Sequence, residues 1–142
     1  MTVSITAVDW QAHREKLLAI RVAVFVEEQG VPSELEHDEH DADALHVLAT
    51  DDRYGAIGTG RLLANGHIGR MAVLASHRGQ GIGGDMLRAL LDIAAQRDLP
   101  QVFLNAQCSA VPFYERHGFI AEGDVFIDAG IDHRRMCRLL NR

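Results

Sequence analysis

The sequence predicts a mixed α/β fold in a single domain that spans residues 1–142. Strand-like and helix-like stretches alternate along the chain, which is typical of folds that pack helices against a sheet. The length of 142 residues suits one domain, and an apolar content of 47% is enough for one core. The elements below follow in chain order.

The chain begins with a strand and a long helix. Residues 2–8 alternate polar and apolar side chains, as a half-buried strand does. Asp9 can cap a helix over 10–28, in which apolar residues recur at helical spacing. Gly30 and Pro32 end this helix.

Three strands in series follow an acidic loop. They cover residues 44–50, 55–64 and 67–74. Asn65-Gly66, between the second and third, is the strongest hairpin signal in the chain. Tight turns between consecutive strands predict an antiparallel meander.

The second half of the chain begins with a β-loop-α-β unit over 67–106. A helix runs from the glycine-rich stretch RGQGIGG to about Arg97, and residues 102–106 form a short apolar strand. The crossover should be right-handed, which makes the two strands of the unit parallel. The remaining elements are a short helix over 110–117 and strands over 119–127 and 134–140.

Charge and composition exclude several classes of protein. The net charge of −6 argues against nucleic-acid binding, which requires a basic face. No apolar run approaches the roughly 20 residues of a membrane span, and the N-terminus has no secretory signal pattern. Two cysteines, Cys108 and Cys137, do not make a disulfide framework. We expect a cytoplasmic protein.

The negative charge is concentrated in residues 34–43, ELEHDEHDAD, whose six acids equal the whole net charge. Its histidines do not complete a metal-ligand pattern, so we assign no metal site. Two interpretations stay open. The segment is either a solvated loop or a negative field that attracts a cationic acceptor, through Asp38, Asp41 and Asp43.

The stretch Arg78-Gly79-Gln80-Gly81-Ile82-Gly83-Gly84 stands directly before a helix. Backbone N–H groups and the helix dipole make such a loop a site for phosphate oxygens, and the missing Cβ atoms allow close approach. Arg78 can pair with a phosphate. A turn that merely needs positive φ is the structural alternative.

Two phosphate-binding motifs fit this loop poorly. A P-loop would end in Gly-Lys-Ser/Thr, which is absent. Gly79, Gly81 and Gly84 match GxGxxG, but a dinucleotide site needs an acid at the end of the next strand, where Leu104 and Asn105 stand.

The pattern Arg78-x-x-Gly81-x-Gly83 resembles the R/Q-x-x-G-x-G/A signature of the GCN5-related N-acetyltransferases, the GNAT family. The strands GRMAVL and VFLNAQ and the segment AVPFYERHGF are similar to the family's cofactor half, in the family's order. RVAVFVEEQGVP and GIDHRRM are similar to the ElaA-like branch. The resemblance implies a mixed central sheet of six to seven strands with a splayed parallel pair, flanked by about four helices.

The resemblance also implies acetyl-CoA as co-substrate, bound where the parallel strands 67–74 and 102–106 splay apart. The residues it assigns to the cofactor are Met71, Ala72, Val73, Arg78, Gly79, Gln80, Gly81, Ile82, Gly83, Gly84, Asn105 and Tyr114. The N–H groups of 78–83 would hold the pyrophosphate, and main-chain groups of 71–73 the pantetheine arm. The N–H of Val73 would polarise the thioester carbonyl.

The implied reaction is direct attack of a primary amine on acetyl-CoA. Tyr114 would act as general acid to the CoA thiolate, since a phenol can protonate it. Glu28 and His133 are the candidate bases that deprotonate the amine. The acceptor would be a small-molecule or protein amine, of cationic character if the acidic segment guides it, and relatives suggest a homodimer. A non-catalytic acyl-CoA sensor with the same fold is the alternative.

Overall fold

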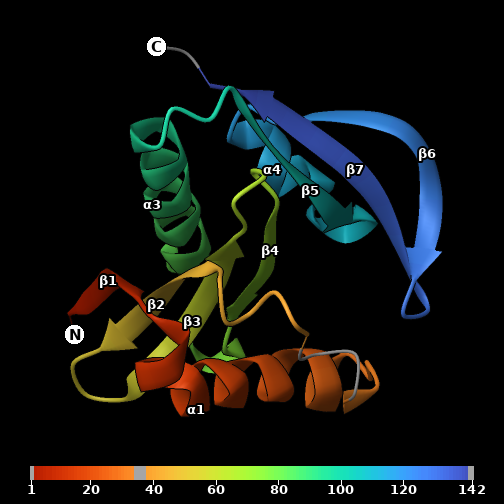
Figure 1. Ribbon diagram of the computed structural model, residues 1–142. Coiled ribbons are helices and arrows are strands. Elements are labelled where there is room, and N and C mark those ends of the chain that lie inside the picture. The colour runs from red at the N-terminus through yellow and green to blue at the C-terminus, as the bar shows by residue number, and fades with distance from the viewer. Residues whose placement is uncertain (1, 34–37, 141–142) are drawn as a thin grey trace.

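Seven strands lie in the residues that this computed structural model describes, 2–33 and 38–140, and they form two sheets (Figure 1). The first sheet has the antiparallel order β1-β2-β3-β4, and the second has the order β5-β7-β6. The strands are β1 (Val3–Val8), β2 (Leu45–Asp51), β3 (Gly55–Leu62), β4 (Ile68–Val73), β5 (Gln101–Gln107), β6 (Ile120–Asp128) and β7 (Ile131–Leu139). The predicted α/β class and the antiparallel meander are therefore confirmed.

Helices cover both faces of the first sheet (Figure 1). The α-helices in the described residues are α1 (Trp10–Arg21), α3 (Ile82–Gln96) and α4 (Val111–Arg116). Because side chains alternate along a strand, Val47 and Ala49 of β2 join the core beneath α3, whereas Leu48 joins the core beneath α1. Among the described residues, no helix is long and apolar enough to span a membrane.

The two sheets meet at a single parallel bridge between His67 and Phe103. It forms just after the predicted Asn65-Gly66 turn, where Phe103 N–H donates to the carbonyl of Gly66 at 3.0 Å. Gly66 has φ +93°, and a Cβ there would come within 2.7 Å of the carbonyl of Gln101. Beyond this bridge β4 and β5 are not paired, so the predicted splayed parallel pair is present, as a seam between two sheets rather than within one.

The helix predicted over 10–28 changes type at its middle. Asp9 caps α1 by accepting from the N–H of Ala12, as predicted, but the α-helix ends at Arg21. Val22–Glu28 form a π-helix, in which the N–H of Gln29 donates to the carbonyl of Val24, five residues back. Three β-branched valines in VAVFVEE weaken the preference for an α-helix here.

The last hairpin is longer than predicted. β7 begins at Ile131 rather than at residue 134, because Ala129 and Gly130 both adopt positive φ and make a tight turn after Asp128. The added residues bring Ile131 and His133 into the cavity described below.

Candidate active site

A cavity of about 520 Å³ opens at the seam between β4 and β5. Its walls come from the π-helix, β3, β4, β5, α4 and the β6–β7 turn. Seven of the predicted site residues line it: Met71, Ala72, Val73, Arg78, Asn105, Tyr114 and His133. Segments far apart in the sequence therefore converge on one space.

A β-bulge shapes the β4 wall. Arg70 and Met71 together face the single residue Gly60 of β3, between the pairs Thr59–Ala72 and Arg61–Gly69. Arg70 adopts φ +52°, the left-handed conformation that such a bulge requires. Opposite them, a Cβ at Gly60 would lie 2.7 Å from the Sδ of Met71, so a larger residue there would displace the Met71 side chain. The bulge turns the main chain at Met71 away from regular pairing, beside the cavity.

The glycine-rich loop leads from β4 to α3, next to Arg78 in the cavity wall. Gly79 and Gly81 have φ +79° and +81°, and a Cβ at either would meet nothing within 4 Å. Gly81 is the N-cap of α3 and provides no side-chain cap, so the first N–H groups of the helix lack acceptors within the helix. Free N–H groups at a helix N-terminus are donors that phosphate oxygens can accept from.

Two residues of this loop also pack against neighbouring elements. Ile82 is buried in the core beneath α3. Gly84 makes room for α4, because a Cβ there would lie 3.3 Å from Nε2 of His117. Neither these residues nor Gly79, Gln80, Gly81 and Gly83 are among those that line the cavity.

Arg78 contacts a carboxylate where the sequence predicts a phosphate partner. Its guanidinium donates to both carboxylate oxygens of Glu28, at 2.5 and 2.7 Å, and its Nε donates to the carbonyl of Val73 at 2.9 Å. The hydrogen bond from Arg78 lowers the pKa of Glu28. A lowered pKa makes Glu28 a weaker base, and Glu28 is not among the residues that line the cavity.

Tyr114 projects from α4 into an aromatic group. Its ring meets those of Phe113 and Phe119 edge-on, at 5.0 and 5.8 Å between centroids. Burial raises the pKa of Tyr114 to about 12, so the phenol keeps its proton across the physiological range.

His133 also lines the cavity, from β7. Its Nδ1 is 2.7 Å from the carbonyl oxygen of Ile131. A carbonyl only accepts, so Nδ1 carries a proton, and the neutral ring then has its lone pair on Nε2. A histidine in this tautomer can accept a proton from a group in the cavity.

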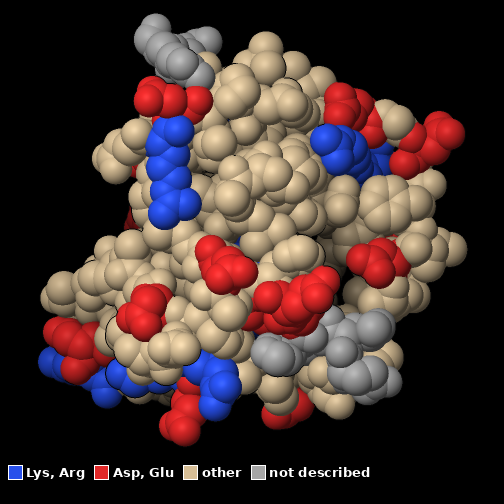
Figure 2. Space-filling model, viewed as in Figure 1, with Lys and Arg blue, Asp and Glu red and all other residues tan. Residues whose placement is uncertain are grey.

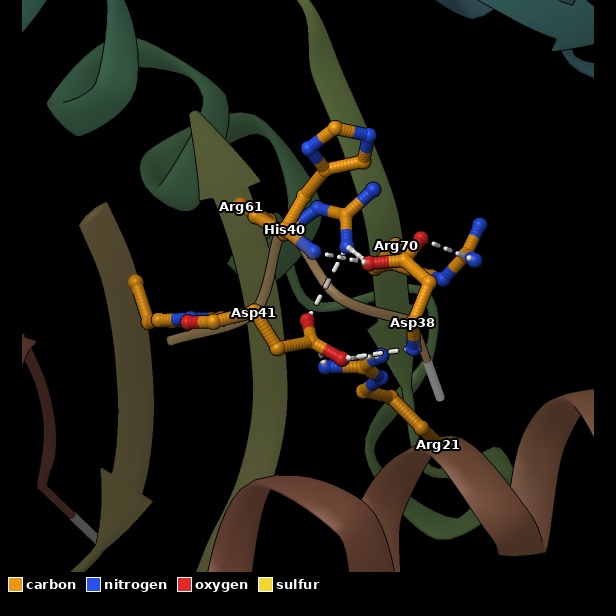
Figure 3. Close-up of polar contacts among 7 residues, drawn as sticks. Arg21, Asp38, His40, Asp41, Arg61 and Arg70 are labelled. Atoms are coloured by element: carbon orange, nitrogen blue, oxygen red, sulfur yellow. Dashed lines mark hydrogen bonds and ion pairs between the residues drawn. The ribbon is translucent and has the colours of Figure 1, made fainter. Parts of the chain in front are cut away.

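In the described part of the acidic segment, Asp38 and Asp41 contact guanidinium groups (Figure 3), whereas Glu39 and Asp43 are exposed. Asp41 is fully buried and accepts from both terminal nitrogens of Arg21 at 3.0 Å and from Arg61 at 3.0 Å. Asp38 accepts from Arg61 at 2.8 Å and from Arg70 at 3.0 Å. Both carboxylates are already paired with guanidinium groups, so they cannot guide a cationic acceptor.

Glu34, Glu36 and His37 of this segment lie outside the described residues. Within residues 2–33 and 38–140, no group of three or more His, Cys, Asp or Glu side chains is arranged to hold a metal ion. On the face shown in Figure 2, acidic and basic side chains are interspersed.

Sequence reasoning missed this charge cluster, although one signal was present. Leu17, Ile20 and Val24 form the buried stripe of the first helix, and Arg21 stands within that stripe. A charged side chain on an apolar face requires a buried partner. The acidic segment supplies that partner through Asp41.

Comparison with known proteins identifies the same fold and chemistry. Residues 10–140 match the model of the acetyltransferase (GNAT) domain family. The uncharacterized N-acetyltransferase YjcF of Bacillus subtilis is 40% identical over 123 residues, which cover 84% of this chain and 87% of that protein.

Two solved structures are closely similar. An acyl-CoA N-acyltransferase from Pseudomonas aeruginosa superposes with a TM-score of 0.84 at 30% identity, over 96% of this chain and 99% of that one. Escherichia coli ElaA superposes with a TM-score of 0.87 at 26% identity, over the same shares. The expected resemblance to ElaA is confirmed.

Proposed function

This chain belongs to the GNAT acetyltransferase family and is an acyltransferase, and on that premise we propose that it transfers the acetyl group of acetyl-CoA to a primary amine. The observation that carries the proposal is the single cavity that joins the bulged β4, Tyr114 and His133. The reaction needs an electrophile site, an acid and a base, and these residues supply each of them.

The co-substrate would lie along the seam between β4 and β5. The N–H groups of residues 78–83 would bind its diphosphate, and main-chain groups of 71–73 and Asn105 its pantetheine arm. The N–H of Val73 would stabilise the oxyanion that forms as the amine attacks the thioester carbonyl.

Two side chains would move protons. Nε2 of His133 would accept a proton from the ammonium form of the acceptor, directly or through water. Tyr114 would donate its proton to the departing thiolate, since its raised pKa ensures that the proton is present. Glu28 is the second candidate base, weakened by its contact with Arg78. A cytoplasmic location, where acetyl-CoA is available, completes the proposal.

The test is release of free CoA thiol by the purified protein with acetyl-CoA and a panel of amines, followed at saturating co-substrate. We expect thiol release that depends on a particular class of amine. A protein that binds acetyl-CoA in calorimetry but releases no thiol with any amine would instead be a sensor of acyl-CoA.

A further inference from the structure

A second hollow, of about 530 Å³, lies between α3, α4 and β7 (Figure 1). Its wall carries three arginines from three different elements, Arg88 of α3, Arg116 of α4 and Arg138 of β7. We call it the cationic pocket, and its other lining residues are Leu91, Asp92, His117 and Gly118. None of these residues lines the cavity at the seam between β4 and β5, and the proposed reaction uses none of them.

The arginines of the cationic pocket carry more positive charge than their neighbours balance. Arg88 contacts the carboxylate of Asp85, whereas Arg138 donates to the main-chain carbonyl of His117 at 2.8 Å. Within the described part of the chain, Arg116 has no hydrogen-bond or ion-pair partner, and the one carboxylate of the pocket wall is ion-paired to none of the three. Guanidinium groups in this state, beside open space, favour an anion.

Two of these arginines are held in position. The main chain at Gly118 has φ +85°, and a Cβ there would lie 3.4 Å from Nε of Arg138, so the glycine lets this side chain pack closely. Arg88 leans back along α3 towards its N-terminus, as long side chains on a helix do. Its Nη1 lies 3.6 Å from the Cβ position of Gly84, the last glycine of the stretch RGQGIGG.

The imidazole of His117 shows that the three charges act on one place. Burial lowers the pKa of His117, and the charges of Arg88, Arg116 and Arg138 lower it further. Nε2 of the same ring lies 3.3 Å from the Cβ position of Gly84. The cationic pocket is therefore next to the glycine-rich loop.

The short helix α4 connects this pocket with the proposed reaction site. Tyr114 lines the cavity, and His117, one turn further on, lines the cationic pocket. Between them, the ring of Phe113 lies 4.9 Å from that of His117 and 3.7 Å from the Cβ position of Gly83. A ligand that extends from the cavity across the glycine-rich loop would reach the cationic pocket.

We infer that the cationic pocket binds a phosphomonoester, and that CoA supplies this group as its 3′-phosphate. The inference rests on the proposed acetyl transfer and extends its co-substrate site beyond the cavity. In CoA a single ribose separates the 5′-diphosphate from the 3′-phosphate, so a diphosphate on the N–H groups of 78–83 places the other phosphate beside Gly84 and Arg88. Guanidinium groups suit it, because their planar fork matches phosphate oxygens. The pocket thus selects CoA thioesters over thioesters that share only the diphosphate and the pantetheine arm.

The test compares acetyl-CoA with acetyl-dephospho-CoA, which lacks only the 3′-phosphate. We expect the dephospho compound to bind about tenfold more weakly in calorimetry, since charge-assisted contacts are lost. Its KM in the thiol-release assay should rise by a similar factor while kcat is unchanged. The reason is that a group remote from the thioester is bound equally in the ground state and in the transition state.

The variant Arg116→Gln assigns this preference to the pocket. Arg116 is exposed and has no partner in the described part of the chain, so its loss should not affect folding. The Kd for acetyl-CoA should rise about three- to tenfold, and that for acetyl-dephospho-CoA should stay within about twofold. Arg97→Gln, exposed at the other end of α3, is the matched control and should change neither value. Thermal unfolding verifies that both variants are folded.

The outcomes separate this inference from the proposed function. Equal affinity of the wild type for the two thioesters overturns the inference and leaves acetyl transfer intact, as does a preference that persists in both Arg116→Gln and Arg88→Gln. If neither thioester binds, acetyl transfer fails, and calorimetry with adenosine 3′,5′-bisphosphate and with adenosine 5′-monophosphate decides the pocket. Tighter binding of the bisphosphate that Arg116→Gln removes supports the phosphate site, and equal or absent binding overturns it.

Discussion

At the scale of single residues, the environment of Tyr114 decides its chemistry. Its ring packs edge-on against those of Phe113 and Phe119, and burial disfavours the phenolate. A tyrosine in water has a pKa near 10, so burial keeps Tyr114 protonated over the whole pH range of an assay. A group in this state can donate a proton but does not act as a base.

The substitution Tyr114→Phe tests that assignment. We expect kcat to fall by about 10²-fold or more, because general acid catalysis contributes on that order, while the Kd for acetyl-CoA changes little. Thiol-release kinetics and calorimetry measure the two quantities. Phe113→Leu is the control for lost packing, and an equal loss of kcat in both variants would remove the catalytic role.

Glu28 and Arg78 make the second residue-scale prediction. Their ion pair is exposed on both sides, at 41% and 42%, so it contributes little to stability. In the proposed binding mode, Glu28 competes with the diphosphate of acetyl-CoA for the guanidinium of Arg78. Glu28→Gln should therefore tighten acetyl-CoA binding about two- to fivefold, with kcat unchanged. A large fall in kcat in a folded Glu28→Gln protein would identify Glu28 as the base.

At the scale of elements, the turn into α3 requires glycine because of its backbone conformation and not for lack of space. Gly81 at the N-cap and Gly123 within β6 both have positive φ and no neighbour within 4 Å of a Cβ position. Gly81→Ala and Gly123→Ala should each cost about 1–2 kcal/mol of unfolding free energy, because an L side chain resists this conformation. Only Gly81→Ala should weaken acetyl-CoA binding. Urea unfolding and calorimetry report the two effects, and equal affinities would disprove the role of this loop.

Hydrogen bonds of the Asp41 carboxylate connect its loop to Arg21 of α1 and Arg61 of β3. Burial alone would raise the pKa of Asp41, but hydrogen bonds and charge from Arg21 outweigh it and lower the pKa from 3.8 to about 2. The folded carboxylate thus binds protons less readily than the unfolded one. Its contribution, about 2 kcal/mol, is complete above pH 4 and is lost as the pH falls towards 2.

Asp41→Asn tests this contribution. It leaves Arg21 buried without its full counter-charge, so we expect a loss of about 3–5 kcal/mol at pH 7 and a weaker dependence of stability on pH between 4 and 2. Asp43→Asn, exposed on the same loop, is the control and should change stability by less than about 0.5 kcal/mol. Urea unfolding at several pH values measures both. Equal stability of the two variants would contradict the role of the cluster.

At the scale of the whole molecule, β6 is an edge strand with an apolar surface. Among residues 2–33 and 38–140, no strand pairs with its outer edge in the order β5-β7-β6, and Ile120, Val125 and Ile127 are exposed by 74%, 53% and 73%. Such an edge favours pairing with a second copy of the chain. Sedimentation should therefore give the mass of a dimer, and Ile127→Glu should give a monomer. Tyr54→Glu, at another exposed site, should leave the dimer intact, and a monomeric wild type would refute the expectation.

The sequence by itself determined the order and type of most elements. Period-two and helical patterns, the Asn65-Gly66 turn and the glycine-rich stretch are local signals, since each depends on residues within one turn or strand. The resemblance to the GNAT family predicted the cavity residues Met71, Ala72, Val73, Arg78, Asn105 and Tyr114, and His133 was predicted as a candidate base from its place in the last hairpin region. All of them line one space. The change from α-helix to π-helix at Val22 had no local signal strong enough to predict it.

Only the tertiary structure decided how the charges pair. Asp41 meets Arg21 and Arg61, each 20 residues away, and Arg78 meets Glu28 across 50 residues. Local patterns cannot reveal such contacts, because they form only when α1, β3 and β4 have packed and excluded water. That packing made Asp41 and Asp38 internal counter-ions of arginines on α1, β3 and β4, because buried charges require partners wherever the fold places them.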